Sequence, residues 1–293
     1  MNTLEKNMHI VLGASGQVGS GVVDWLIRQK QPVKGVIRNP EKATELQEKG
    51  AKTAIADAFD QAALQTALKD GTTIFVLTPE TLITDDIIGD TKTILENYRK
   101  AVESSSIKKI VGLSSYGAQH ASGTGNLMLS YMLEHAFVGL PVQQIFVRPA
   151  YYYSNFLPYL PVVKAEGILP TFFPVDLKLP MISPQDVAHF VAEAMTKTVE
   201  GVAIYELEGP THYSPEDVAQ TLGQVLNKDV KAEQIPRQRW KETLQQAGFY
   251  VDAMKNLMEM TEAVISGLAR PEKKETIAVT GRTTLEQYMI DLA

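Results

Sequence analysis

The stretch MHIVLGASGQVGSGVVDWLIR, residues 8–28, decides the fold predicted for this chain. Its apolar start, its spaced glycines and its helical remainder predict a strand, a tight turn and a helix. The first N–H groups of a helix are free and carry a partial positive charge, so such a turn attracts phosphate. Gly13 permits the sharp turn, Gly16 lets the backbone approach a pyrophosphate, and Gly19 lets the helix pack closely on the sheet.

A plain structural turn is the alternative interpretation of these glycines. Because a strand precedes them, a helix follows them and the alternating pattern continues along the chain, the context favours dinucleotide binding. The residues expected to hold the pyrophosphate are Gly13, Ser15, Gly16, Gln17, Val18 and Gly19.

The composition excludes several classes of function. The chain has 293 residues, 44% of them hydrophobic, which is enough for one large domain or one and a half. A net charge of −6 without a basic tract argues against direct binding to nucleic acid. The absence of cysteine excludes thiolate catalysis and disulfides, and the histidines lack the spacing of metal ligands, so no metal site is expected.

The rest of the first half repeats the alternation of strand and helix. Apolar strands are expected at 8–12, 33–37, 53–56, 73–77, 109–113 and 143–147, each of the first five followed by a helical pattern. Such a succession predicts a parallel sheet that helices cover on both faces. Residues 151–180 are rich in proline and aromatic residues and are expected to be irregular, whereas 203–207 is expected to return to the main sheet as a strand.

The predicted fold class is therefore α/β, a doubly wound parallel-sheet Rossmann domain with a smaller, mostly helical C-terminal lobe. Residues 1–155 and 181–208 are assigned to the first domain, and 156–180 and 209–293 to the smaller lobe, with a cleft between them. No signal peptide and no stretch of about 20 apolar residues is visible, so a cytoplasmic protein without a membrane segment is expected.

The end of the second strand decides the preferred nucleotide. Sites selective for NAD place an acidic residue there, where it binds the ribose 2′-hydroxyl. This chain instead has Arg38, whose planar guanidinium can pair with a 2′-phosphate. NADP(H) is therefore favoured over NAD(H). The alternative is an ordinary surface arginine that pairs with Glu41 or Glu45.

Residues at the ends of the other strands are the further candidates for the cofactor site, because the carboxyl ends of parallel strands line the ligand crevice. Asp57 suits either the adenine edge or the cap of the next helix. The remaining candidates, expected near the ribose and nicotinamide, are Leu77, Thr78, Pro79, Ser114 and Tyr151.

Four segments in order resemble the NmrA-like branch of the atypical short-chain dehydrogenases/reductases: GASGQVG at 13–19, VIRNPEKA at 36–43, KKIVGLSSYGA at 108–118 and LPVQQIFVRPAYYYSNF at 140–156. Segments at 181–195, 205–222 and 283–292 extend the resemblance over nearly the whole chain. The resemblance implies an NAD(P)-binding fold. It also implies either reduction of quinones and other small substrates, or binding of NADP(H) as a redox sensor without turnover.

The residues expected to act in catalysis depart from a familiar pattern. Short-chain dehydrogenases use Tyr-x-x-x-Lys after the fifth strand, and here Tyr131 is followed by His135 in place of the lysine. These residues, four apart, share one helix face and are the candidates for a proton relay to substrate. The alternative, which we favour, is that Tyr131 packs on the core and His135 is a partly buried helix residue. His120 is another candidate donor.

Quinone reduction would need no tyrosine–lysine pair, because hydride passes directly to an electron-poor ring and solvent can supply the proton. Aromatic side chains that suit a flat substrate follow the sixth strand, although core packing is the alternative for at least half of them. The expected substrate residues are Tyr116, Tyr153, Asn155 and Phe156. The other aromatics of this segment are Tyr151, Tyr152, Tyr159, Phe172 and Phe173.

The sequence thus favours an NADP(H)-dependent oxidoreductase that transfers hydride to a quinone or a similar small electron-poor substrate. A non-catalytic NADP(H)-binding redox sensor is the alternative. The expected partners are a small-molecule substrate and a second copy in a homodimer, with neither nucleic acid nor membrane.

Overall fold

The computed structural model describes residues 7–79, 84–198 and 200–291. Its main sheet has eight strands in the order β13-β10-β6-β5-β4-β1-β2-β3, and each neighbouring pair is parallel. The strands are β1 (Met8–Leu12), β2 (Val33–Ile37), β3 (Lys52–Ile55), β4 (Gly71–Leu77), β5 (Lys109–Leu113), β6 (Gln143–Pro149), β10 (Val202–Glu208) and β13 (Ile277–Thr280). The predicted α/β fold with a parallel sheet is confirmed.

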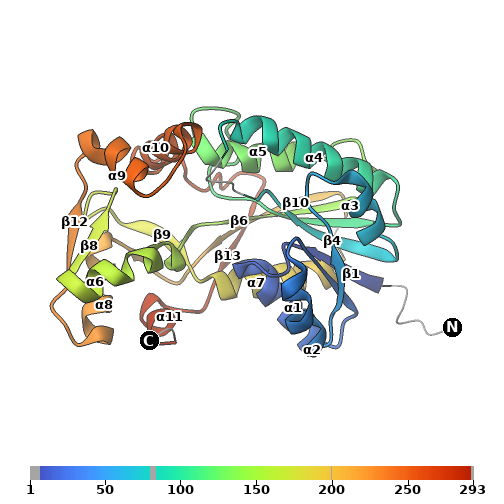
Figure 1. Cartoon of the computed structure of the whole chain (residues 1–293), viewed down its shortest axis with the longest axis horizontal. Helices are drawn as coiled ribbons and strands as arrows, with labels where there is room; N and C mark the ends of the chain where they lie inside the picture. Colours follow the sequence, from blue (N-terminus) through green and yellow to red (C-terminus); the bar gives the residue numbers. More distant parts are fainter. Residues whose placement is uncertain (1–6, 80–83, 199, 292–293) are drawn as a thin grey trace.

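Helices cover both faces of this sheet (Figure 1). One face packs against α1 (Gln17–Arg28), α2 (Ala43–Glu48) and α7 (Pro184–Thr196), and the other against α3 (Gln61–Ala67), α4 (Ile87–Glu103) and α5 (Met128–His135). Successive side chains of a strand point to opposite faces. In β4, Phe75 therefore joins the first apolar cluster, whereas Ile74 and Val76 join the second.

Capping side chains mark the residues at which the helices begin. The Asp60 side chain accepts a hydrogen bond from the Ala63 N–H and begins α3. Asp57 instead accepts from the Phe59 N–H at 2.9 Å, so the alternative role expected for it, capping this helix, belongs to Asp60. Ser214 forms a capping box with Asp217 at α8 (Pro215–Leu226). Each cap satisfies a helical N–H that would otherwise lack a partner.

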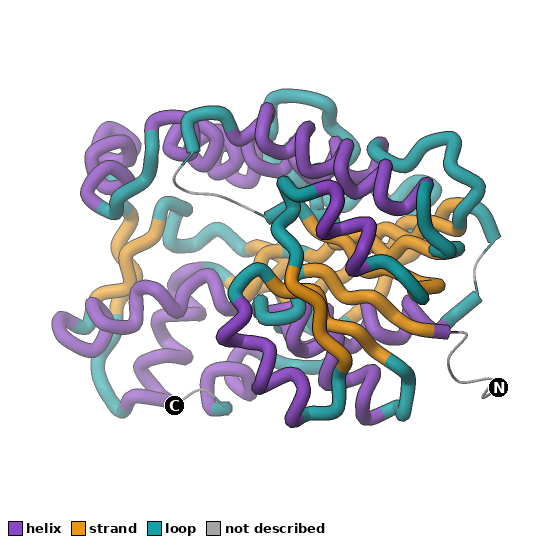
Figure 2. The backbone as a smooth tube through the Cα atoms, turned by 45° about the vertical axis from the view of Figure 1, so that its right-hand side comes forward, coloured by secondary structure: helices purple, strands orange, loops and turns teal. Residues whose placement is uncertain are grey.

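Beyond the main sheet lies a smaller part with its own apolar core, at the left of Figure 1 and separated from the main strands in Figure 2. A two-stranded sheet of β8 (Ile168–Thr171) and β12 (Lys231–Gln234) lies there with α6 (Leu160–Glu166), α8 and α9 (Trp240–Gln246). Two further helices, α10 (Val251–Ile265) and α11 (Leu285–Ile290), pack at its upper and lower sides in this view.

Residues 151–180 are more regular than expected. They form β7 (Tyr151–Tyr152), the 3-10 helix η4 (Tyr153–Tyr159), α6, β8 and the start of β9 (Leu179–Ile182). The expectation of irregular structure was wrong because a proline near a helix start does not break the helix, and Pro161 lies within the first two positions of α6.

The last strand was also missed by the sequence pattern. Residues 277–280 form β13, which pairs with β10 at the edge of the main sheet, although the segment was expected to be mostly helical. The strand has four residues and most of them are exposed, so it lacks the apolar run that marks the buried strands.

Candidate active site

The glycine turn has the geometry of a phosphate cradle. Gly13 has a φ of +62° and its carbonyl accepts the Gly16 N–H at 2.9 Å. A Cβ at Gly19 would lie 2.2 Å from the Gly13 carbonyl oxygen, so only glycine fits there. No side chain caps α1 at Gly16, its first turn holds no acid, and Ser15 to Gln17 are exposed. The N-terminus of α1 is therefore open to an anion.

Arg38 lies exposed at the end of β2, next to this turn. The turn and the strand are joined because the Ala14 N–H donates to the Val36 carbonyl at 3.2 Å. The acids expected to pair with Arg38 are engaged elsewhere, since Glu41 bonds to Asn39 and Glu45 pairs with Lys49. Within the described ranges, the Arg38 guanidinium has no protein acceptor. The guanidinium is therefore available to an anion.

A cavity of about 1770 Å³ opens at the carboxyl ends of the strands, beside the turn. Gln17, the first residue of α1, lines it and accepts a hydrogen bond from the Ser154 hydroxyl at 3.1 Å. Ligand sites usually span roughly 300–1,000 Å³, so this one has room for part of a dinucleotide and a substrate together. The sequence-predicted residues that line it are Gln17, Leu77, Thr78, Ser114, Tyr116, Tyr151 and Asn155.

The other predicted site residues lie outside this lining. Apart from Gln17, the residues of the glycine turn lie at the adjacent N-terminus of α1. Arg38 follows the end of β2 beside them. The remaining residues outside the lining are Asp57, Pro79, His120, Tyr131, His135, Tyr153 and Phe156.

Tyr131 and His135 turn away from the cavity. Their rings stack with centroids 4.0 Å apart, and the His135 Nδ1 lies 2.8 Å from the Tyr131 carbonyl oxygen. The residues of α5 that reach the cavity are Leu129 and Ser130. The structural interpretation is not met in detail either, because Tyr131 is only half-buried and His135 is exposed. The catalytic role of the pair stays a prediction that the cavity lining does not support.

Most of the aromatic segment forms core rather than cavity wall. Tyr153 and Phe156 are 0% and 2% exposed, and the Tyr153 hydroxyl donates to the Thr283 carbonyl at 3.2 Å. From the aromatic segment only Tyr151 and Tyr152 line the cavity. The sequence analysis did not identify an aliphatic wall of the cavity, which α10 and the 3-10 helix η3 (Gly125–Leu127) before α5 supply. This wall comprises Leu127, Leu257, Met260, Val264 and Ile265.

A buried ionic network supports the cavity floor and was also missed. The Arg148 guanidinium donates to both oxygens of Glu134 at 2.8 and 2.7 Å and to Glu272 at 2.8 Å. The Ser114 hydroxyl donates to Glu134 at 2.5 Å. Burial disfavours the cation, but Glu134 and Glu272 outweigh it and raise the pKa of Arg148. An arginine directly after the apolar run Ile145–Val147 of a buried strand was the available signal, because such a charge needs a partner.

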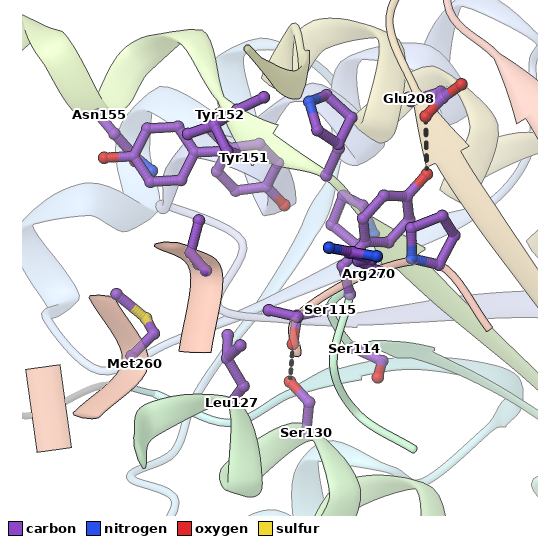
Figure 3. Close-up of a pocket in the computed structure, with 18 of the residues that line it drawn as sticks. Ser114, Ser115, Leu127, Ser130, Tyr151, Tyr152, Asn155, Glu208, Met260 and Arg270 are labelled. Carbon is purple, nitrogen blue, oxygen red and sulfur yellow. Dashed lines mark hydrogen bonds between the residues drawn. The ribbon is translucent and has the colours of Figure 1, made fainter. Parts of the chain in front are cut away.

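A second polar group in the lining contains Glu208, which is labelled at the upper right of Figure 3. The Tyr116 hydroxyl donates to the Glu208 carboxylate at 3.3 Å, and the His212 Nε2 lies 3.4 Å from the same oxygen. Burial first, and then the charge of Glu208, raises the pKa of Tyr116, so this phenol stays protonated. In the same view Ser115 donates to Ser130 at 2.9 Å.

Two absences concern only the part of the chain that the structure describes. No helix there is long and apolar enough to cross a membrane. No group of three His, Asp or Glu side chains in those ranges is arranged to hold a metal ion.

The chain has relatives of known activity. It is 27% identical over 265 residues to the NAD(P)H azoreductase of Xenophilus azovorans, covering 85% of this chain and 86% of that protein. It is 23% identical over 243 residues to quinone oxidoreductase 2 of Escherichia coli (strain K12), covering 82% of each.

Solved structures share the fold. Quinone oxidoreductase QOR2 of Escherichia coli, complexed with NADPH, superposes with a TM-score of 0.79 at 21% identity over 97% of this chain and 99% of that one. The triphenylmethane reductase of a Citrobacter species gives 0.79 at 19% identity over 98% and 99%. A model of the NmrA-like family matches residues 5–289, nearly the whole chain. With the glycine turn, the parallel sheet and this match in agreement, the chain belongs to the NmrA-like family.

Proposed function

We propose that this chain is an NADP(H)-dependent oxidoreductase that transfers hydride to a quinone or a similar small electron-poor substrate. One observation carries the proposal: the uncapped N-terminus of α1 opens beside a cavity large enough for both a nicotinamide and a substrate. The relatives named as azoreductase and quinone oxidoreductase support the same class of reaction.

Each part of the site has a distinct task in this proposal. The backbone of the glycine turn binds the pyrophosphate, and Arg38 binds the 2′-phosphate. Leu77, Thr78, Ser114 and Tyr151 line the end that receives the nicotinamide. When bound, the reduced nicotinamide supplies the hydride.

The chain contributes orientation and exclusion of water around the reacting atoms. Tyr116 and Asn155 line the substrate side of the cavity and offer hydrogen bonds to substrate oxygens. Solvent protons complete the reduction of a quinone to its hydroquinone, so the reaction does not require the tyrosine–lysine pair that the chain lacks.

The test is turnover by the purified chain. NADPH and a panel of benzoquinone, menadione and naphthoquinones are mixed with the protein, and oxidation is followed by the loss of absorbance of the reduced nicotinamide. The matched control is Gly19→Val, which blocks the turn because its Cβ would meet the Gly13 carbonyl. Oxidation is expected with the parent and not with the control. No oxidation above background on any quinone contradicts the proposal.

The placement of Tyr131 and His135 outside the cavity lining favours one second candidate, a redox sensor that binds NADP(H) without turnover. Calorimetry with NADPH and NADP⁺ separates the two functions. A sensor binds one form more tightly and oxidises no quinone, and equal affinities would remove this candidate.

A further inference from the structure

The cavity contains cations that its own carboxylates do not neutralise. Among the residues that the structure describes, the acidic ones in its lining are Glu206 and Glu208, and both are engaged. Glu206 accepts the N–H groups of Glu272 and Lys273, at 2.5 and 3.1 Å, and Glu208 is bound to Tyr116 and His212.

Two lining cations are left over. Of the lining lysines, Lys178 pairs with Asp217. Arg270 and Lys273 also line the cavity, and in the described part of the chain neither side chain has an acidic partner or a hydrogen-bond acceptor. Both side chains are exposed, and an exposed guanidinium beside a cavity and without a protein anion is available to an anionic ligand.

Arg270 is held in position by its backbone. The Gln119 side-chain amide donates to the Arg270 carbonyl oxygen at 2.9 Å, and the Ala269 N–H donates to the Ala263 carbonyl at 3.0 Å. On its other side, Glu272 is bound to the buried Arg148. The guanidinium lies against Gly267, where a Cβ would come within 2.1 Å of its Nη2. Because this segment is already ordered, binding an anion costs little further conformational entropy.

The rest of the cavity is apolar on one side. Figure 3 draws Leu127 and Met260 on the side of Ser115 away from Arg270. Leu257 and Val264 continue this aliphatic wall along α10. A ligand that fits both regions has a flat or elongated apolar body and one acidic group.

We infer that Arg270 selects anionic substrates, binding a carboxylate, sulfonate or phosphate ester whose apolar body packs on the wall formed by Leu127, Leu257, Met260 and Val264. This inference rests on the proposed function, since it names the substrate class of the same cavity. The phosphates of the cofactor are the other source of such an anion. The sites proposed for them are the glycine turn and Arg38, and of these residues Gln17 alone belongs to the lining that contains Arg270.

The test is equilibrium binding, which does not depend on turnover. Calorimetry compares 2-naphthalenesulfonate with the neutral naphthalene-2-sulfonamide, with and without saturating NADP⁺. The parent protein is expected to bind the sulfonate about tenfold more tightly, because a charge-assisted hydrogen bond contributes roughly that factor at a solvent-accessible site. Raising the salt concentration should reduce the difference.

Arg270→Met should remove most of the preference for the sulfonate, with Lys273 as the lining cation that remains, and leave the sulfonamide unaffected. The matched control is Lys255→Met, which removes the same charge from an exposed position on α10 outside the cavity. Equal affinities for the two probes in the parent protein overturn the inference. Undetectable binding of the sulfonate to the parent protein also overturns it. A third contrary outcome is that Arg270→Met weakens the binding of NADP⁺ and leaves the binding of the sulfonate unchanged. If no quinone is reduced while the sulfonate preference depends on Arg270, the proposed reaction fails and the anion site stands.

Discussion

Arg38 is the residue on which the cofactor preference depends. Its guanidinium is exposed and unpaired in the described ranges because Glu41 and Glu45 bond elsewhere. We predict that Arg38→Met raises the KM for NADPH about 10- to 100-fold, since a hydrogen bond to a charged group contributes roughly 1.5–3 kcal/mol. The KM for NADH is the internal control and should change less than about threefold. A parallel loss with both cofactors would show that Arg38 supports the fold rather than the 2′-phosphate.

His9 makes the stability of the fold depend on pH. It is 4% exposed in β1, its Nδ1 has no partner among the described residues, and burial followed by the charge of Lys109 lowers its pKa from 6.5 to about 4. The folded state therefore favours the neutral ring. Its stabilising effect is complete above pH 6.5 and is lost as the pH falls towards 4.

Unfolding in urea at pH 7 and pH 5 measures this effect. His9 should account for a loss of about 2 kcal/mol of unfolding free energy between these values, at roughly 1.4 kcal/mol per pH unit below 6.5. The variant His9→Gln has no titrating ring and should lose correspondingly less over the same interval. Identical pH dependence in the two proteins would contradict the assigned pKa.

At the level of elements, the sequence predicts what depends on local chemistry. The six strands of the first half and the return of β10 to the sheet follow from apolar runs. The orientation of α5 does not, because a helix of eight residues with apolar groups on several sides can turn more than one face inward. The partnership of Glu134 with Arg148 decides it, and these two residues lie 14 positions apart.

That orientation gives a prediction about α5. Tyr131 and His135 stack on each other outside the cavity lining, so Tyr131→Phe and His135→Gln should each leave kcat/KM for a quinone within about twofold of the parent. Ser130→Leu, on the same helix, extends a larger side chain into the cavity and should lower kcat/KM at least tenfold. If Tyr131→Phe or His135→Gln lowers kcat and leaves KM unchanged, the result would support the hypothesis of a proton relay through these residues.

At the level of the whole molecule, the cavity is assembled from segments distant in sequence. Its lining draws on α1, the ends of β4, β5 and β6, and α10, with Glu206 tying residues 272 and 273 to the main sheet. The glycine turn and Arg38 are local motifs and could be predicted. The aliphatic wall and Arg270 could not, because only the packing of α10 beside the loop before α5 brings them to the cavity.

The residues expected to bind the cofactor come from several of these segments. Cofactor binding should therefore stabilise the whole chain against unfolding. A ligand present at 100 times its Kd raises the unfolding free energy by about 2.7 kcal/mol, which corresponds to a Tm increase of roughly 4–5 °C for a chain of this size. We expect NADP⁺ to produce this shift in differential scanning fluorimetry, and Arg38→Met to reduce it for NADP⁺ and not for NAD⁺. A Tm unmoved by saturating amounts of either dinucleotide would remove the assignment of the glycine turn as a pyrophosphate site, and with it the proposed reaction.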